Sequence, residues 1–523
     1  MLLLSLGLRD VLDDPRIAGD SNQVVLPENI NWVRARVEDR FSTRPRDEWI
    51  AELTSVGVPC GPLHSAQEWL DHEQMRAIGM RLEIDDSDLG AVVMPGMPIN
   101  LVDTPAVVRT ISPQLGEHGG RVIPRDPKGK PTGRPPLRLG PLDGFKTLGI
   151  GTFVATPYAG MLLATLGAQV VKVEPPQGDP FRTSGFMYNR GVQSIAIDLK
   201  AEEGLRAFYG LASTADVIID GLRPGVTTRL GIDYDSMVKL KPDIISLSLS
   251  AYGEGGPMSH LPGFDMVIQG VSGQMSFQGG ADEPVANTIA INDMMSAVGL
   301  TLGATLALLH RVRSGLGQRA WASIAGFASL LQCGEIVAYR GSPRAAPGSA
   351  DHKGSGIFDR YYRTADHWVR LARPSSDYAV DIERSGLAID VEAFVTDGAS
   401  ELQRVLGTMA ANDVVASLRP VGVSCAISRS ITEVIRDPVL IAAESFHFRH
   451  APNRRVYVLP GRLSCFSRTP KFGDPRTPGL GEHSTSVLRQ AGFDKEAIKA
   501  ILHHGAVIEG DQFLDSALPV AYR

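Results

Sequence analysis

Cysteine is scarce in this chain: only four of its 523 residues are cysteines, and no two of them form a Cys-x-x-Cys pair. So few, unpaired cysteines argue against a disulfide framework and against a cysteine zinc site. We therefore expect no metal centre and a reducing compartment, the cytoplasm.

The chain also lacks a strong charge excess and an evident membrane segment. Its formal net charge of -6 gives no reason to expect a nucleic acid or an anionic membrane as partner. The apolar start, Met1–Leu8, has no basic region before it and ends at once in Arg9-Asp10, which favours a core helix over a signal peptide. No apolar run approaches the length that spans a bilayer, so we expect no membrane association.

What the chain does contain is an alternation of strand-like and helix-like segments. Short β-branched runs at Gln169–Val173, Asp216–Asp220 and Ile244–Ser250 are interleaved with helical stretches such as Tyr234–Leu240. This order predicts an α/β domain with a Rossmann-like parallel sheet, which binds a nucleotide beyond the carboxyl ends of its strands. The first strand ends in Gly149-Ile-Gly151 without the Gly-x-Gly-x-x-Gly fingerprint, which argues against an NAD role.

One carboxylate, Asp293, opens a long helix of small, almost uncharged residues within Ile289–Gln318. An acid in the first turn of a helix is favoured by the helix dipole, and on this segment alone that explanation is the simpler one. The alternative is a nucleophilic carboxylate held at a helix N-terminus. The surrounding sequence decides between the two.

Several ordered blocks around Asp293 resemble one family. They are Leu142–Gly149, Ala159–Arg182, Asn189–Lys200, Ala215–Gly231 and Tyr252–Pro257. In this order they resemble the family III CoA-transferases (CaiB/BaiF type), a family that includes 2-methylacyl-CoA racemases. The resemblance runs from about Pro141 to the C-terminus.

The resemblance implies a reaction and a fold. In the transferases, an aspartate at the position of Asp293 attacks an acyl-CoA thioester; here Asn292 replaces the usual preceding glycine. The implied activity is transfer of CoA between carboxylic acids through an aspartyl-acyl anhydride and an aspartyl-CoA thioester. Coenzyme A is then a substrate, with a small carboxylic acid as co-substrate and no permanently bound cofactor. The implied fold joins a large parallel-sheet domain to a small α+β domain in an interlocked dimer.

Family positions that contact CoA transfer onto this chain one by one. They are Val154 and Ala155 in the first strand-to-helix turn; Ile197, Asp198, Leu199 and Lys200 near the adenosine end; Gly221, Leu222, Arg223 and Arg229 after the third strand; and Phe264 and Asp265. Arg223 and Arg229 are the expected phosphate partners, because a guanidinium group binds phosphate through two donors at once. Either arginine could instead be an ordinary solvated cation at a helix end.

A short glycine segment provides a further candidate. Gly354 and Gly356, beside His352, match the place of a mobile glycine-rich loop over the active site in oxalate-using transferases. Such a loop can close over reactive intermediates and exclude water. The glycine run here is shorter than in those enzymes, and an ordinary turn is the alternative.

Two departures from the family pattern bear on function. Val192-Gln193 stands where many members have a basic pair, which removes positive charge near the nucleotide. Phe264 replaces the histidine of the racemases' His-Asp pair, and phenylalanine cannot move a proton. This favours a transferase. The alternatives are an acyl-CoA isomerase, racemase or lyase on the same fold, or a non-catalytic partner subunit.

An internal repeat changes the expected domain organisation. Gly57–Cys60 returns as Gly422–Cys425 and Leu115–His118 as Leu480–His483, both displaced by 365 positions (425 − 60 and 483 − 118). Equal displacement of two distant motifs indicates two copies of one unit. By the resemblance, both motifs belong to the small domain and the tail of a subunit.

We therefore expect a first, incomplete copy whose large domain is missing, followed by a complete second copy. The missing large domain either precedes this sequence in a longer protein or is supplied by another chain, and the sequence leaves both open. The predicted parts are residues 1–120 for the small domain and tail of the first copy, 121–140 for a Pro-, Gly- and base-rich linker, 141–344 for the large CoA-binding domain, 345–452 for the small domain and 453–523 for the return to the large domain. The apolar positions Trp49, Ile50, Leu53 and Val56 have helical spacing and should need a covering surface. We expect a homodimer or a complex with a separate large-domain chain.

Overall fold

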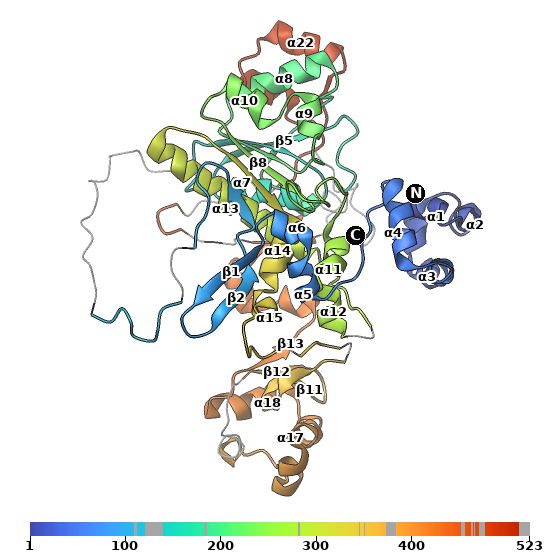
Figure 1. The fold of residues 1–523 in the computed structure, drawn as a ribbon, viewed down its shortest axis with the longest axis vertical. Helices are drawn as coiled ribbons and strands as arrows, with labels where there is room; N and C mark the ends of the chain where they lie inside the picture. Colours follow the sequence, from blue (N-terminus) through green and yellow to red (C-terminus); the bar gives the residue numbers. More distant parts are fainter. Residues whose placement is uncertain are drawn as a thin grey trace. The chain divides into compact units, whose positions relative to one another are not determined.

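The computed structural model describes residues 1–108, 112–120, 140–182, 186–280, 283–344, 346–349, 351–372, 383–450, 456–461, 464, 466–469 and 476–511. The chain forms two compact units, Met1–Pro347 with Cys465–Arg523, and Gly348–Ser464 (Figure 1). The predicted linker, residues 121–140, lies outside the described residues except for Gly140.

The first unit is built on an eight-stranded sheet. Its order is β16 (Val507–Ile508), β6 (Gln193–Ile197), β5 (Gln169–Glu174), β4 (Lys146–Ile150), β7 (Val217–Asp220), β8 (Ile245–Ser250), β9 (Arg319–Ser323) and β3 (Ile99–Leu101). The six central strands are parallel, whereas β16 and β3 pair antiparallel with their neighbours at the two edges. The chain runs outward from β4 to β6 and then returns to β7, so the strand order reverses between β4 and β7.

Helices cover both faces of this sheet. The core on one face includes residues of α7 (Ala155–Thr165), α13 (Ile291–Ser314) and α14 (Ile324–Leu331). The core on the other face includes residues of α8 (Glu202–Ser213), α10 (Tyr234–Leu240), α21 (Ser484–Gln490) and α22 (Lys495–His503). The strands are buried on both sides, so neighbours such as Ile218 and Ile219 enter opposite cores. This explains why β7 reads as a continuous apolar run.

Helix α13 packs closely on α14. A side chain at Gly299 would place its Cβ only 1.9 Å from the Phe327 ring, so only glycine allows this approach.

Among the described residues, α13 is also the one helix long and apolar enough to cross a membrane by length and composition, which overturns the expectation that no apolar run reaches that length. Half of its apolar window is buried inside the protein, so α13 is a core helix.

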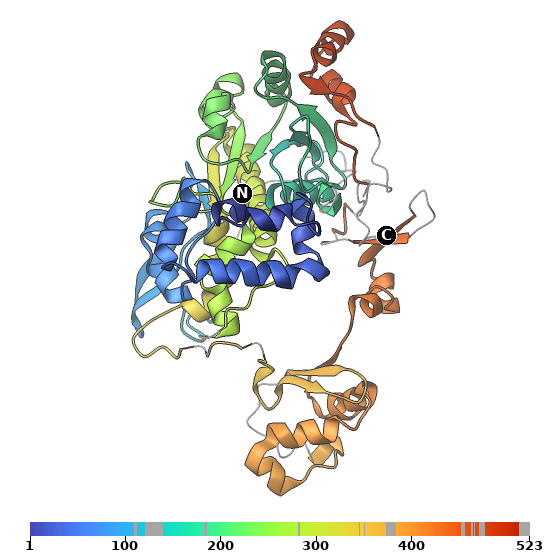
Figure 2. The same cartoon turned by 90° about the vertical axis from the view of Figure 1, so that its right-hand side faces the viewer.

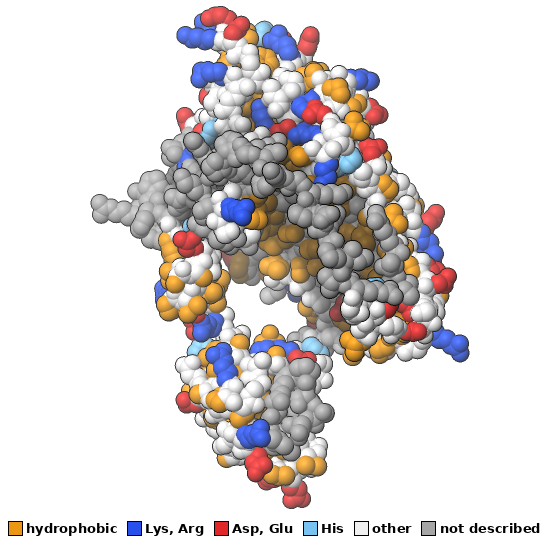
Figure 3. All heavy atoms as spheres, turned by 90° about the vertical axis from the view of Figure 1, so that its left-hand side faces the viewer, with side chains coloured by type: hydrophobic (Ala, Val, Ile, Leu, Met, Phe, Trp, Pro, Cys, Tyr) orange, Lys and Arg blue, Asp and Glu red, His pale blue; other side chains and the backbone are white. Residues whose placement is uncertain are grey.

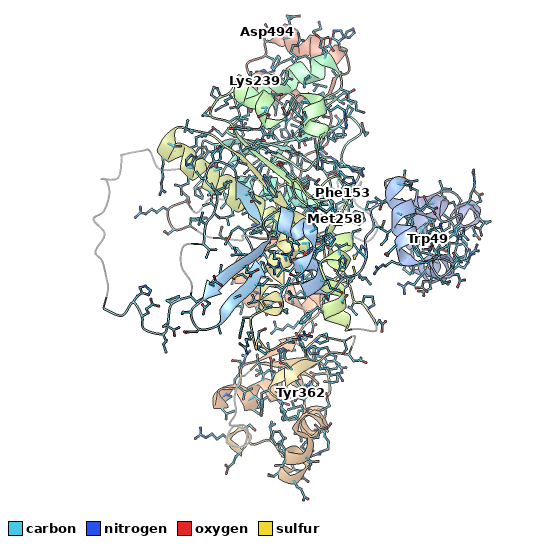
Figure 4. All side chains as sticks on the ribbon, viewed as in Figure 1. Trp49, Phe153, Lys239, Met258, Tyr362 and Asp494 are labelled. Carbon is cyan, nitrogen blue, oxygen red and sulfur yellow. The ribbon has the colours of Figure 1, made fainter. Side chains whose placement is uncertain are left out.

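The N-terminal residues form a small helical cluster. It consists of α1 (Leu2–Ser5), α2 (Arg9–Asp13), the 3-10 turn η1 (Ser21–Val25), α3 (Pro27–Phe41) and α4 (Arg46–Ser55). Trp49, labelled in Figure 4, is buried here; its indole N–H donates to the Phe41 carbonyl, and Arg44 stacks on its ring. Trp49 and Leu53 are each 3% exposed, so the expectation that they need an outside surface is wrong. Of Trp49, Ile50, Leu53 and Val56, only Val56 is exposed.

The next segment packs against the large sheet. It contains α5 (Ala66–Asp71), α6 (Glu73–Ala77), the hairpin of β1 (Arg81–Asp86) and β2 (Gly90–Pro95), and the edge strand β3. Trp69, Met75, Ile78 and Met80 join the core that also contains residues of α7, α13 and α14. Around this core lie α11 (Asp265–Val271), α12 (Gln274–Gly279) and α15 (Cys333–Ile336). On the opposite face of the sheet, α9 (Val226–Leu230) precedes α10. Residues from the predicted first copy therefore complete the core of the large domain.

The second unit is α+β. Its antiparallel sheet contains β10 (Gly354–Gly356), β11 (Asp359–Arg363), β12 (Trp368–Ala372) and β13 (Cys425–Ser428), backed by α17 (Val391–Leu406), α18 (Ala411–Leu418) and η3 (Arg419–Val421). Two short helices, α19 (Ile431–Val434) and α20 (Pro438–Ala442), lead to the hairpin of β14 (Phe446–His450) and β15 (Val456–Pro460) (Figure 2, orange ribbon). The unit extends to Ser464, beyond the predicted boundary at 452, because this hairpin spans that position.

Charged side chains are mixed over the visible surface. On the face drawn in Figure 3, basic and acidic side chains are interspersed among the residues that the structure describes. The described residues of that face therefore form no basic stripe of the kind that tracks a nucleic acid backbone.

Candidate active site

The candidate site is a cleft of about 390 Å³ at the point where the strand order reverses. Open α/β sheets bind ligands at this position, outside the carboxyl ends of the strands. Two loops form much of its wall: residues 152–156 follow β4, and residues 221–224 follow β7. The sheet topology thus brings together two segments that are far apart in the sequence.

Asp293 lies in this cleft, in the first turn of α13. Ala290, the residue before α13, makes no side-chain hydrogen bond that caps the helix. Instead, Oδ2 of Asp265 accepts hydrogen bonds from the backbone N–H groups of Asn292 at 2.6 Å and Asp293 at 3.0 Å. Asp265 begins α11 and is itself buried, so it acts as a cap supplied by another helix. These hydrogen bonds hold the backbone at Asp293 and so fix the position from which its side chain extends.

The surroundings of Asp293 favour its protonated form. Asp293 is only 8% exposed. Burial, and to a lesser extent the negative charge of Asp265, together raise the pKa of Asp293 from an ordinary 3.8 to about 7. A carboxyl group that titrates near neutrality in a cleft is typical of a functional site.

This raised pKa predicts a pH-dependent stability difference. Between about pH 4 and pH 7 folded Asp293 keeps a proton that the unfolded chain has lost, so its contribution to the free energy of unfolding falls as the pH rises. Asp293→Asn removes this penalty. We expect the variant to gain stability over the parent between pH 4 and pH 7, by a few kcal/mol at about 1.4 kcal/mol per pKa unit, with no further gain above pH 7. Urea denaturation of both proteins at pH 4.5, 6 and 8 measures this; a difference that does not change with pH would contradict it.

Most of the CoA contacts predicted after β4 and β7 lie together in the cleft. Its lining includes Val154, Ala155, Leu222 and Arg223 together with Phe264. Gly221 also lines it, and a Cβ at this position would lie 2.4 Å from the hydroxyl of Thr156, so a side chain here would have to displace Thr156. Arg223 is exposed at this site, available to an anionic ligand.

Other predicted CoA contacts are not among the residues that line this cleft. Ile197, Asp198, Leu199 and Lys200 lie at the end of β6, and β5 separates β6 from β4. Ile197 is buried in its pairing with Val507 of β16, and Asp198 holds the Lys200 backbone N–H at 3.0 Å. Arg229 is exposed on α9. These positions stay predictions.

The predicted glycine loop belongs to the second unit. Gly354 and Gly356 form the edge strand β10, which pairs with Arg360 and Asp359 of β11. The backbone N–H of His352 donates to the Ser349 carbonyl in the turn before β10. Their role at the active site stays a prediction.

The structure adds cleft residues that the sequence did not indicate. Phe153 has a left-handed backbone, with φ of 65°, and its N–H donates to Oδ1 of buried Asp179 at 3.2 Å (Figure 4). Asp179 is held in turn by Lys172 at 2.8 Å. Pro59 reaches the same cleft from the predicted first copy. No local sequence signal marks Phe153, whereas Pro59 lies inside the repeated motif Gly57–Cys60 and could have been considered.

The described residues contain no group of three or more His, Cys, Asp or Glu side chains placed to hold a metal ion.

Comparison with known proteins identifies the family. The model of CoA-transferase family III matches two stretches of this chain, residues 2–119 and 142–484. The chain therefore belongs to CoA-transferase family III.

Its relatives include both transferases and a racemase. The succinate–glutarate CoA-transferase of Agrobacterium fabrum is 29% identical over 390 residues, which cover 68% of this chain and 96% of that protein. The alpha-methylacyl-CoA racemase of Mus musculus is 28% identical over 391 residues, covering 71% and 98% respectively. The crystal structure of a CaiB/BaiF family protein from Brucella suis matches with a TM-score of 0.60 at 24% identity and covers 68% of this chain and all of that one. This last likeness shows the fold, including the large sheet with its parallel core.

Proposed function

We propose that this protein transfers CoA between carboxylic acids, with Asp293 as the covalent nucleophile. The observation that carries the proposal is the position of Asp293: a capped helix start presents its carboxyl group to a cleft lined by Arg223 and the 152–156 loop. The relatives named CoA-transferases support the reaction class.

The proposed reaction proceeds through four linked acyl exchanges. The Asp293 carboxylate attacks the thioester carbonyl of the donor acyl-CoA, forming a mixed anhydride and releasing CoA thiolate. The thiolate attacks the aspartyl carbonyl of the anhydride, which gives an aspartyl-CoA thioester and frees the first acid. The acceptor acid attacks this thioester, which forms a second anhydride and releases CoA thiolate. The thiolate then attacks the acceptor's acyl carbonyl in this anhydride, which gives the new acyl-CoA and frees the Asp293 carboxylate. Each step exchanges one activated acyl derivative for another, so no step loses the thioester energy to water.

The surroundings supply what this sequence of steps needs. The buried site limits water around the anhydride, which would otherwise be hydrolysed. Asp265 holds the start of α13 through two backbone hydrogen bonds and so keeps the Asp293 carbonyl carbon in one place during both attacks. Arg223 is exposed and suited to a CoA phosphate. Coenzyme A enters as a substrate, and the proposal uses no resident cofactor.

A racemase is the second candidate, because one relative carries that name. Phe264 argues against it: this residue lines the cleft beside Asp265, where the racemases have a histidine, and its ring cannot accept a proton. A transferase needs no carbon acid chemistry at this position. The residue at position 264 therefore distinguishes the two activities, since phenylalanine is compatible with a transferase but cannot act as the racemase base.

One experiment tests both activities. The protein is incubated in D₂O with a 2-methylacyl-CoA and an excess of succinate or glutarate, and the products are followed by mass spectrometry and NMR. We expect succinyl-CoA or glutaryl-CoA to form without deuterium at C2 of the donor. Deuterium incorporation at a rate comparable with turnover would contradict the assignment of Phe264, and hydrolysis without transfer across a panel of acids would contradict the transferase.

A further inference from the structure

Most residues that line the cleft around Asp293 are apolar. If Asp293 carries the acyl group, as the proposed function requires, the rest of that group extends from the Asp293 carbonyl into a cleft of about 390 Å³. The side chains in the cleft walls then choose between acids. Apart from two aromatic rings, the apolar side chains include those of Pro59, Val154, Leu261 and Ile324.

The two aromatic rings in the cleft walls are only half covered by the protein. Phe153 is 55% exposed and Phe264 is 52% exposed. In contrast, the large aromatic side chains of Trp69, Tyr252 and Phe327 are each at most 1% exposed. An apolar ring that lines a concave site gains most when the apolar part of a ligand covers it. The cleft therefore offers two such surfaces near Asp293.

The backbone of Phe153 is held in place by buried charged groups. Its left-handed φ of 65° is unfavourable for a residue with a side chain, and such strain persists mainly at functional sites. Oδ1 of Asp179 accepts hydrogen bonds from the backbone N–H groups of Phe153 at 3.2 Å and Phe181 at 2.9 Å. Asp179 is 5% exposed, and Lys172 donates to its other oxygen at 2.8 Å. The structure thus specifies where Phe153 begins.

Phe264 is fixed by the same contacts that fix the proposed nucleophile. It directly precedes Asp265, whose Oδ2 accepts the backbone N–H of Asp293 at 3.0 Å. Buried Gln269 donates to the other oxygen of Asp265 at 2.5 Å. The backbone of Phe264 therefore keeps a constant position relative to Asp293.

Charge in the cleft is scarce. Among the described residues that line it, only Asp293 and Arg223 carry a charged side chain. The proposed function uses Arg223 for a CoA phosphate, which leaves no cation in this lining for a second carboxylate on the acid. A dicarboxylate would bring an unpaired charge out of water and close to Asp265, and both effects disfavour it.

We propose that the acid preferred by this protein is an apolar monocarboxylic acid with a branched or aromatic chain, not a dicarboxylate. Its carboxylate reacts at Asp293, and its chain packs against the rings of Phe153 and Phe264. The preference lies in kcat/KM at equal concentrations, so succinate in excess still accepts CoA.

The pantetheine arm of CoA is the other group that could cover these rings. Its amide groups need hydrogen-bond partners, which a phenylalanine ring does not provide as well as a polar side chain does. If CoA were the occupant, replacing Phe153 would weaken the transfer to every acid by the same factor. The proposed contact instead predicts a change in the ratio between two acids.

Two acids of equal size test the proposal. In 4-methylpentanoate an isopropyl group replaces the second carboxylate of succinate, so the two acids have the same number of non-hydrogen atoms and differ in charge. The purified protein is incubated with 2-methylpropanoyl-CoA and equal concentrations of both acids, and the initial rates of both acyl-CoA products are measured by mass spectrometry. We expect 4-methylpentanoyl-CoA to form at least about tenfold faster, the scale on which apolar pockets discriminate.

Variants at position 153 assign this preference to the ring. Phe153→Ala should lower the ratio of 4-methylpentanoyl-CoA to succinyl-CoA at least about fivefold, whereas Phe153→Leu, which stays large and apolar, should keep it within about twofold. Phe153→Lys supplies the missing cation and should reverse the preference toward succinate. The control is Leu240→Ala, because Leu240 is 43% exposed on α10 and does not line the cleft. It should leave the ratio unchanged.

The outcomes separate this inference from the proposed function. Equal or faster transfer to succinate in the parent protein, or a ratio that Phe153→Ala leaves unchanged, would overturn the inference while the transferase stands. So would transfer to other acids but not to 4-methylpentanoate. Transfer to no acid of a wider panel would overturn the transferase and the inference together.

Discussion

Replacing Asp293 by asparagine is expected to reduce CoA transfer by at least about 10³-fold, because the amide cannot attack a thioester. Asparagine has nearly the shape of aspartate, and the cap from Asp265 acts on the backbone N–H of residue 293, so the start of α13 should keep its position. The variant should also lose covalent labelling. Incubation with an acyl-CoA, reduction with borohydride and peptide mapping should show modification at Asp293 in the parent protein and none in the variant.

The matched control is Asp413→Asn. Asp413 also stands in the first turn of a helix, α18, but it is exposed and outside the cleft. We expect this control to keep its activity within about twofold. Full activity of Asp293→Asn, or a label on another residue of the parent protein, would show that Asp293 is not the nucleophile.

Replacing Gln74 by leucine is expected to lower the free energy of unfolding by roughly 3–5 kcal/mol. The buried amide of Gln74 donates to two carbonyls, and its oxygen accepts the N–H of Met258 at 2.7 Å. Leucine has a similar volume but leaves these three backbone groups unpaired, at about 1–3 kcal/mol each. The change should also loosen the loop from Tyr252 to Phe264, because Gln74 joins this loop to α6.

Calorimetry and hydrogen exchange measure these two effects. The melting temperature should fall, and the amides of residues 252–258 should exchange faster than in the parent. Gln67→Leu is the control, since Gln67 lies on α5 and is exposed, with a single hydrogen bond to Asp71. Its effect should stay within about 0.5 kcal/mol. Equal melting temperatures for both variants would mean that the polar contacts of Gln74 add little to the packing of residues 65–80.

The fold could be predicted where local sequence carries the information. The short apolar run at β7 and the helical period of α10 depend on residues that are neighbours in sequence, and both elements lie where their patterns place them. The repeat at a displacement of 365 was also visible, because it needs only the comparison of two motifs. Likewise, an aspartate before a long small-residue helix could be recognised from the order of residues.

The candidate site needed information that no local pattern contains. Asp265 caps α13 from 28 positions away, and Pro59 enters the cleft from beyond the predicted linker. Phe153 takes a left-handed backbone that nothing in its residue type favours, held by Asp179. The segment Gly354–Gly356 pairs with Arg360 and Asp359 as an edge strand, a contact that its own residues do not indicate.

The sequence by itself determined the family, the alternating α/β pattern, the position of Asp293 in the first turn of a helix and the presence of two related segments. These follow from residue order and periodicity, which are local properties of the chain. Only the tertiary structure decided that β4 and β7 lie side by side, that burial and the charge of Asp265 raise the pKa of Asp293, and that residues 65–80 pack into the core of the large domain. Strand order, burial and the distance between two charges depend on which distant segments pack together, and packing is settled by the whole chain.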